Sequence, residues 1–241
     1  MLGQRILAEH KALVLVGGLG TRLKSVYSEG PKAMAPIRGK PFLDHLLRGL
    51  ARAGFVDVVL CVGYRHEPIR EFFGDGSRIG LNLHYSIERE LLGTAGAIRL
   101  GAIKFASGER VFAINGDTLH PIDYTEMLRF HNRKRANCTI TLAEVQDAVR
   151  YGSVELQPSG RVIGFLEKNA PSGRSLVNSG TYIFEPNVID AIPADRPVSL
   201  EREVLPLILG ELVVGFTSQA YFIDIGVPAD YIRAQTELEE L

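Results

Sequence analysis

The stretch from Leu15 to Lys24, LVGGLGTRLK, combines closely spaced glycines with a cation, the residue types that bind phosphate groups. Glycines let backbone N–H groups approach an anion, and the Arg22 guanidinium is a forked donor for phosphate oxygens. The spacing fits neither common glycine motif. The third glycine of a Rossmann fingerprint falls on Leu23, and no Lys-Ser or Lys-Thr pair follows as in a P-loop. Alone, the stretch is as consistent with a structural turn as with a phosphate loop.

Other charged residues occur where a sheet would bring them to the same place. Lys32 lies in PKAMAP, where two prolines restrict the backbone around it. Glu88 ends a strand-like run, and so do Asp117 and Asp224, whose two carboxylates could supply the hard oxygen ligands that Mg²⁺ prefers. Each of these acids could instead be a cap, a turn residue or a solvated group. The histidines show no metal-ligand spacing, and no Ser or Cys has a nucleophile's surroundings, so we expect no covalent intermediate.

Strand-like and helix-like segments alternate in a way that would position these residues. We expect strands at 11–18, 57–64, 81–88, 110–118 and 138–145, with helices at 42–54, 66–76, 94–105 and 123–136 between them. The later strands, at 151–157, 160–168, 175–185 and 220–226, are closer together, and helices are expected at 199–209 and 228–240. This pattern predicts an α/β fold with a Rossmann-like, doubly wound mixed sheet and a smaller antiparallel half. We expect one domain over 1–241, with one half over about 11–145, a second half over about 146–241, and a cleft between them.

Composition excludes several other classes of protein. The 241 residues carry a formal net charge of −1, so no broad basic surface for nucleic acid or an anionic membrane is expected. No apolar run approaches the roughly 20 residues of a membrane span, and the N-terminus lacks a signal-peptide core. Cys61 and Cys138 lie in apolar, β-branched runs, which favours buried thiols over a disulfide. We therefore expect a cytoplasmic protein.

The combination of GGLGTRL with the following PKAMAP resembles the sugar-phosphate nucleotidyltransferase family. These enzymes join a sugar 1-phosphate to a nucleoside triphosphate and release pyrophosphate. The resemblance continues over nearly the whole chain through ERELLGTAGAI, NGDT, RYGSV, FLEK, VNSGTYIF and FIDIGVPADY. This chain departs from the family pattern at Leu91, where proline is usual, and at Val227, where threonine is more frequent.

The resemblance implies that the half over about 11–145 binds the nucleotide and the smaller half over about 146–241 binds the sugar, and it implies a role for each matching residue. Arg22 would bind the leaving pyrophosphate, Lys32 the α-phosphate and Lys168 the sugar phosphate, while Asp117 and Asp224 would hold Mg²⁺. The implied nucleotide-binding residues are Val16, Gly17, Gly18, Gly20, Thr21, Arg22, Glu88, Gly93, Thr94 and Asp117. The implied sugar-binding residues are Gly152, Glu167, Lys168, Asn178 and Gly180. Because neighbouring residues of a strand point to opposite faces, a bulge or strand end must let both Glu167 and Lys168 reach the ligand.

The expected substrates are GTP and a sugar 1-phosphate. The Glu88 carboxylate only accepts hydrogen bonds, and guanine offers two adjacent donors where uracil or thymine offers one. Within the family, YSIERELLGT, RYGSV and YFIDIGVPADY favour a heptose 1-phosphate, whose GDP-sugar would supply bacterial capsule or surface polysaccharides. The alternatives are mannose 1-phosphate with GTP, another sugar 1-phosphate with UTP, and a non-catalytic nucleotide-sugar sensor. A homodimer stays open, because periodicity does not separate a dimer face from a core face.

Overall fold

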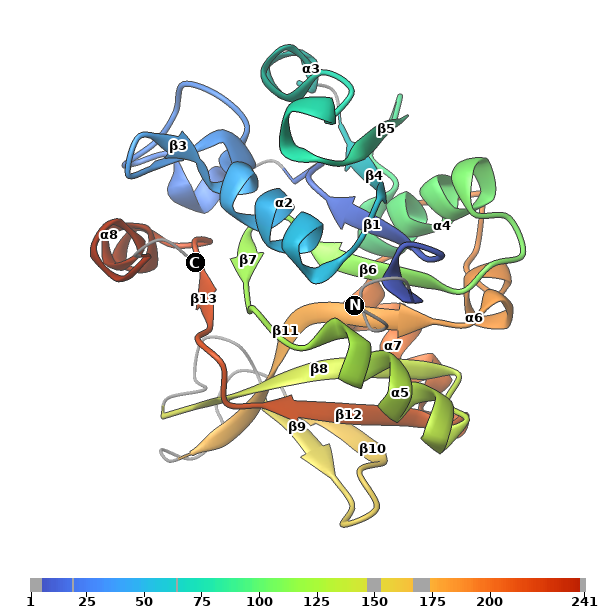
Figure 1. Cartoon of the computed structure of the whole chain (residues 1–241). Coiled ribbons are helices and arrows are strands. Elements are labelled where there is room, and N and C mark those ends of the chain that lie inside the picture. The colour runs from blue at the N-terminus through green and yellow to red at the C-terminus, as the bar shows by residue number, and fades with distance from the viewer. Residues whose placement is uncertain (1–5, 19, 64, 147–152, 167–173, 239–241) are drawn as a thin grey trace.

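The computed structural model is built on one mixed seven-stranded sheet with the strand order β12-β8-β11-β6-β1-β4-β5 (Figure 1). The structure describes residues 6–18, 20–63, 65–146, 153–166 and 174–238. The strands of this sheet are β1 (Lys11–Leu15), β4 (Asp57–Val62), β5 (Asn82–Ile87), β6 (Val111–Asn115), β8 (Cys138–Val145), β11 (Ser175–Phe184) and β12 (Val213–Ser218). Strands β6, β1, β4 and β5 are parallel neighbours, so their carboxyl ends meet at one edge of the sheet. Ligands bind at this edge in open α/β sheets.

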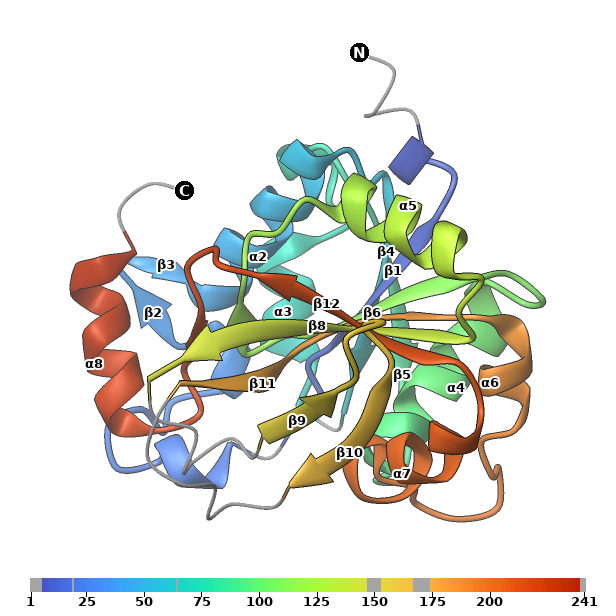
Figure 2. The ribbon, with the colours of Figure 1, turned by 90° about the horizontal axis from the view of Figure 1, so that it is seen from below.

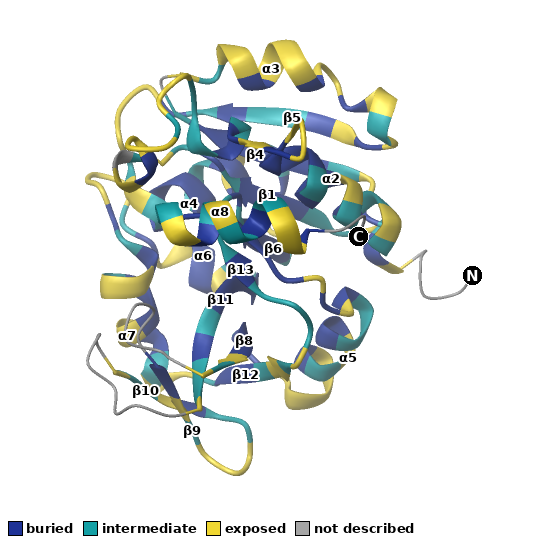
Figure 3. Ribbon diagram, turned by 90° about the vertical axis from the view of Figure 1, so that its left-hand side faces the viewer, coloured by how far each residue is buried: buried dark blue, intermediate teal, exposed yellow. Residues whose placement is uncertain are grey.

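Helices cover both faces of this sheet, as the doubly wound prediction requires. They are α2 (Phe42–Ala53), α3 (Glu67–Phe73), α4 (Gly93–Phe105), α5 (Tyr124–Lys134), α6 (Pro186–Asp190), α7 (Leu205–Leu207) and α8 (Pro228–Glu237). On β1, Val14 packs into the apolar cluster of α2 and α5, while Leu13 packs into the cluster of α4, α6 and α7. Figure 2 shows these two groups of helices on opposite sides of the sheet. Burial on both faces explains why the strand is a continuous apolar run, and Figure 3 shows the buried strands inside the more exposed helices.

In the described parts of the chain, three two-stranded ladders lie outside the central sheet. They are β2 (Pro36–Ile37) with β3 (Lys40–Pro41), β7 (Thr118–Leu119) with β13 (Ile223–Asp224), and β9 (Ser153–Leu156) with β10 (Val162–Leu166). All three are antiparallel. The ladder of β7 with β13 matters most for function, because it joins the NGDT segment to the segment that carries Asp224.

The structure differs from the predicted elements in the last third of the chain. The helix expected over 199–209 is a π turn (Leu200–Val204), the short α7 and a 3-10 turn (Ile208–Gly210). Pro206 lacks an N–H donor, which prevents a regular helix there. The strand expected over 220–226 has only the two residues of β13, and β12 was not predicted at all. β12 is the edge strand beside β8, and it follows the irregular helical segment without a clear change in apolar pattern.

Cys61 and Cys138 are buried free thiols on β4 and β8, which confirms the prediction. Among the helices that the structure describes, none is long and apolar enough to cross a lipid bilayer.

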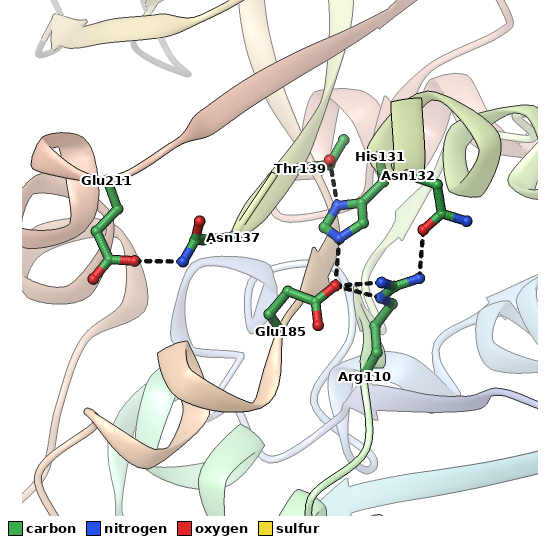
Figure 4. A network of polar contacts seen from close by, with 7 residues as sticks. All are labelled: Arg110, His131, Asn132, Asn137, Thr139, Glu185 and Glu211. Atoms are coloured by element: carbon green, nitrogen blue, oxygen red, sulfur yellow. Dashed lines mark hydrogen bonds and ion pairs between the residues drawn. The ribbon is translucent and has the colours of Figure 1, made fainter. Parts of the chain in front are cut away.

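A network of buried and half-buried polar side chains lies at the edge of the sheet opposite the carboxyl ends of the parallel strands (Figure 4). Glu185, directly after β11, accepts hydrogen bonds from Arg110 Nε at 2.6 Å and from His131 Nε2 at 2.9 Å. The other ring nitrogen of His131 lies 2.7 Å from Thr139 Oγ1. We call this set, Arg110, His131, Thr139 and Glu185, the Glu185 network.

Candidate active site

The glycine-rich loop after β1 approaches two other segments so closely that side chains are excluded. A Cβ at Gly17 would lie 2.9 Å from Glu88 Oε1, and a Cβ at Gly20 would lie 3.0 Å from the Lys32 Cβ. Gly20 also has a left-handed backbone with φ 59°. At Gly18 the Cβ position meets nothing within 4 Å. The loop therefore contacts Glu88 at Gly17 and Lys32 at Gly20, and the Cβ position of Gly18 faces open space.

The residues that follow Gly20 form a 3-10 turn, Thr21–Leu23. Arg22 is exposed, and it lines the cavity that the glycine loop borders. The backbone of Thr21 lies in the same turn, and its side chain lies outside what the structure describes.

Lys32, Asp117 and Asp224 form a charged cluster, although they come from distant parts of the chain. Lys32 Nζ lies 2.6 Å from Asp117 Oδ2 and 3.7 Å from Asp224 Oδ1. The antiparallel ladder of β7 and β13 pairs Asp224 with Thr118, the residue after Asp117, and so places the two carboxylates side by side. The Lys32 side chain is 11% exposed, compared with 37% for Asp117 and 29% for Asp224. The cluster is therefore open to a ligand mainly on its carboxylate side.

The charge balance of this cluster favours a further cation. Burial and the neighbouring Asp117 charge raise the pKa of the Asp224 carboxyl, and the Lys32 ammonium only partly opposes them. Asp224 Oδ1 also accepts a hydrogen bond from the Gly226 N–H at 2.6 Å. Within the described ranges, His, Cys, Asp and Glu side chains do not gather in groups of three or more that could hold a metal ion. Two partly exposed carboxylates fit a hard cation that takes its remaining ligands from substrate phosphates and water.

Glu88 is a buried carboxylate on the other side of the glycine loop. It follows β5, is 7% exposed, and its Oε2 accepts the Leu92 N–H at 3.0 Å. Burial raises the pKa of this carboxyl, and the Leu92 hydrogen bond opposes the shift. The Leu92 N–H occupies only one lone pair of Oε2, and Oε1 accepts no hydrogen bond from the described residues. The carboxylate can therefore still accept two donors from a ligand.

Residues 197–201 form a strap against the start of α4, and sequence reasoning missed its contribution to the site. Val198 N donates to Leu92 O at 2.8 Å, and Val198 O accepts from the Ala95 N–H at 3.0 Å. Thr94 Oγ1 accepts from the Leu200 N–H at 2.7 Å and donates to Glu201 Oε2 at 3.1 Å. Pro197 and Glu201 thereby line the same cavity as Glu88. No linear spacing indicates this, because the strap meets α4 only through the tertiary fold.

One cavity of about 690 Å³ brings most of the predicted nucleotide and metal residues together. Its lining includes Val16, Gly17, Gly18, Arg22, Lys32, Glu88, Gly93, Thr94, Asp117 and Asp224. Asn115, Gly116 and Thr118, from the end of β6 and the start of β7, also line it. Gly20 instead borders an adjoining cavity of about 420 Å³ that shares Val16, Gly17 and Gly18. The larger volume is in the range that binds small molecules.

The structure describes only part of the predicted sugar side. Gly152, Glu167 and Lys168 lie outside the described residues. Gly180 has φ 77°, and a Cβ there would lie 2.5 Å from the side-chain amide of Asn115, so it adjoins the cavity wall. Asn178 is not among the described residues that line the cavity: its amide donates to Tyr182 Oη at 2.7 Å and accepts the Gly180 N–H at 3.0 Å. Both of these side-chain hydrogen bonds of Asn178 are made within β11.

The fold and site define an α/β protein with a cavity at the carboxyl edge of its sheet, where open α/β sheets bind their ligands. The family model described as "Nucleotidyl transferase" matches residues 11–240, and the chain belongs to this family. The resemblance and the fold predicted from the sequence are thereby confirmed, and so is the prediction of a transferase.

Several relatives are similar over nearly the whole chain. The D-glycero-alpha-D-manno-heptose 1-phosphate guanylyltransferase of Aneurinibacillus thermoaerophilus is 43% identical over 230 residues, which cover 95% of this chain and 98% of the relative. The mannose-1-phosphate guanylyltransferase of Mycobacterium tuberculosis is 40% identical over 230 residues, 94% of this chain, but the chain spans only 64% of that protein's length. The crystal structure of HddC from Yersinia pseudotuberculosis complexed with GMP-PN has a TM-score of 0.86 at 35% identity, covering 95% of this chain and all of that one.

Proposed function

We propose that the protein transfers a guanylyl group from GTP to D-glycero-α-D-manno-heptose 1-phosphate and releases pyrophosphate. The product, GDP-heptose, would serve bacterial capsule or surface polysaccharide synthesis. The observation that carries the proposal is one cavity lined by both a buried acceptor, Glu88, and a phosphate-binding cluster around Lys32. A carboxylate with room for two donors suits the adjacent N–H groups of guanine better than the single N–H of uracil. The heptose is supported by a relative of that activity that is matched from end to end.

Charge stabilisation and positioning are sufficient for this reaction. A phosphate oxygen of the sugar 1-phosphate attacks the α-phosphorus in line, and pyrophosphate leaves. No general base is needed, because the attacking phosphate is already ionised near pH 7. Arg22 would stabilise the leaving pyrophosphate, Lys32 the α-phosphate, and Lys168 the sugar phosphate. These cations act on charge that is spread over the transferring group in the transition state.

Asp117 and Asp224 would hold Mg²⁺. When bound, the ion would offset the negative charge that the phosphates of the two substrates bring together. The β7–β13 ladder holds the two carboxylates side by side, and the Gly226 N–H orients the Asp224 carboxylate. The hydrogen bond from Lys32 to Asp117 must lengthen or be shared when Lys32 binds a phosphate.

Mannose 1-phosphate with GTP is the second candidate pair. It is supported by the 40% identity to the mycobacterial enzyme, which shares the guanylyl donor. Heptose and mannose differ by one hydroxymethylene of the acceptor sugar. The two candidates therefore differ in the acceptor and not in the nucleotide site.

A matrix of substrates tests the proposal. The purified protein is incubated with Mg²⁺, one of GTP, UTP, dTTP or ATP, and one of heptose, mannose or glucose 1-phosphate, and pyrophosphate release is measured. GTP with heptose 1-phosphate should give the largest kcat/KM. Asp117→Asn should abolish the activity, whereas Asp57→Asn, at the amino end of β4, should leave it unchanged. A preference for UTP, or an active Asp117→Asn variant, would contradict the proposal.

A further inference from the structure

His120 is a buried histidine that lies three residues beyond Asp117 and belongs to none of the predicted site residues. It directly follows β7 and is 4% exposed. Its ring packs edge-on against Phe222, with the ring centroids 5.8 Å apart, and Phe222 directly precedes β13. His120 therefore lies beside the short ladder that places the two carboxylates of the charged cluster.

On its other side, His120 contacts an irregular part of β11. The pairing of β11 with β8 shifts between Asn178 and Tyr182, so that two extra residues of β11 are accommodated in a bulge. Asn178 pairs with Leu142 and Tyr182 with Ile140, which leaves Thr141 opposite the bulge. A carbonyl that loses its ladder partner in this way needs another donor.

A chain of two hydrogen bonds supplies that donor. The hydroxyl of Ser179 donates to the Thr141 carbonyl at 3.0 Å, and His120 Nδ1 lies 2.8 Å from the same hydroxyl. A hydroxyl has one proton, and Ser179 gives it to Thr141, so Nδ1 must carry the hydrogen and donate to Ser179. Burial lowers the pKa of His120 to about 4, which agrees with a neutral ring. The other nitrogen, Nε2, is buried without a hydrogen-bond partner among the residues that the structure describes.

The bulge that this chain supports forms part of the cavity wall. Gly180, next to Ser179, lies so close to Asn115 that a Cβ would meet the Asn115 amide nitrogen at 2.5 Å. Asn115 lines the cavity and is two residues before Asp117. His120 is thus connected to the cavity wall in two ways. The polypeptide backbone connects it to Asp117 and Asn115, and the hydrogen bond to Ser179 connects it to the bulge of β11.

We propose that His120 is a positioning residue for the transferase reaction, an inference that rests on the proposed function. Its neutral imidazole, through Ser179, fixes the bulge of β11 against the segment that carries Asp117, and so sets the acceptor-side wall relative to the metal carboxylates. The residue touches neither substrate in this role. The nucleotide base lies near Glu88, on the far side of the glycine loop, and its binding should be little affected.

The test compares steady-state kinetics of four variants with those of the wild-type protein. His120→Leu keeps a side chain of similar size and removes the donor, and Ser179→Ala removes the intermediate hydroxyl. Both should lower kcat/KM for the sugar 1-phosphate by about 10- to 100-fold, while KM for GTP changes by less than about threefold. His120→Asn can place an N–H near the position of Nδ1 and should restore most of the loss. The double variant His120→Leu/Ser179→Ala should be no worse than the poorer single variant, because both break the same chain.

His131→Leu is the matched control. His131 is equally buried and makes two side-chain hydrogen bonds, but it belongs to the Glu185 network at the opposite edge of the sheet (Figure 4). It should lower stability and leave both KM values unchanged. Wild-type kinetics in His120→Leu, an equal kinetic loss in His131→Leu, or no recovery in His120→Asn would overturn the positioning role. A wild-type protein that releases no pyrophosphate from any pair would instead refute the proposed function, and the positioning role with it.

Discussion

Replacing Gly93 by alanine tests how the strap holds the start of α4. Gly93 has φ 74°, and a Cβ there would lie 2.4 Å from the carbonyl oxygen of Val198. That oxygen accepts the Ala95 N–H, and Val198 N donates to Leu92 O, so the strap cannot retreat without losing backbone hydrogen bonds. Gly108 provides the control, because it has φ 73° and meets nothing within 4 Å of its Cβ position.

The two variants separate backbone strain from the steric clash. A left-handed alanine costs about 1–2 kcal/mol, and this cost applies to both variants. The overlap with Val198 should add about 1–3 kcal/mol in Gly93→Ala alone. Gly108→Ala should therefore lose about 1–2 kcal/mol of unfolding free energy, and Gly93→Ala about 2–5 kcal/mol.

Urea unfolding followed by circular dichroism measures both losses, since the chain contains no tryptophan for fluorescence. Because the strap carries Glu201 into the cavity, kcat/KM in the pyrophosphate assay should also fall by about 10- to 100-fold in Gly93→Ala and stay unchanged in Gly108→Ala. Equal losses of stability in the two variants would show that the Val198 contact costs nothing. Normal activity in a destabilised Gly93→Ala would show that the strap does not position the site.

Three further predictions concern the base, the metal and acid stability. Glu88→Gln should lower kcat/KM for GTP by about 10- to 100-fold, because an amide donor replaces an acceptor worth about 1.5–3 kcal/mol, and an unchanged value would refute the base-reading role. Removal of divalent metal by EDTA should stop pyrophosphate release, and excess Mg²⁺ should restore it, because Asp117 and Asp224 act by holding the ion and not as general bases. Release that persists in EDTA would contradict this role. Burial lowers the pKa of His120 from 6.5 in the unfolded chain to about 4 in the folded protein. As the pH falls, the imidazole is therefore protonated in the unfolded chain before it is protonated in the folded protein. The stability that the neutral ring contributes above pH 6.5 is lost as the pH falls towards 4. Between pH 7 and pH 5 the wild-type protein should lose about 2 kcal/mol more unfolding free energy in urea than His120→Asn, and parallel losses would argue against a neutral buried ring.

Much of the architecture can be predicted from local pattern, and the errors have specific causes. The helix over 42–54 is α2 with Gly54 as its left-handed cap, because apolar periodicity and a terminal glycine both depend only on near neighbours. The strand β12 was missed, since an apolar run after an irregular helical turn has no period that distinguishes strand from helix. Pro206 divides the segment over 199–209, although the apolar spacing on both sides of it is helical.

The sequence by itself determined where the chemistry could lie. A glycine loop after a buried strand and acids at strand ends are local features, and parallel strands bring their carboxyl ends to one edge whatever the details of packing. Only the tertiary structure decided which of these groups meet. Lys32 and Asp117 are 85 residues apart in the chain, and His120 and Ser179 are 59 apart, yet each pair is within hydrogen-bond distance. Such contacts depend on strand register, on the bulge in β11 and on glycines that allow close approach, and these are set by packing among distant segments, which no local period encodes.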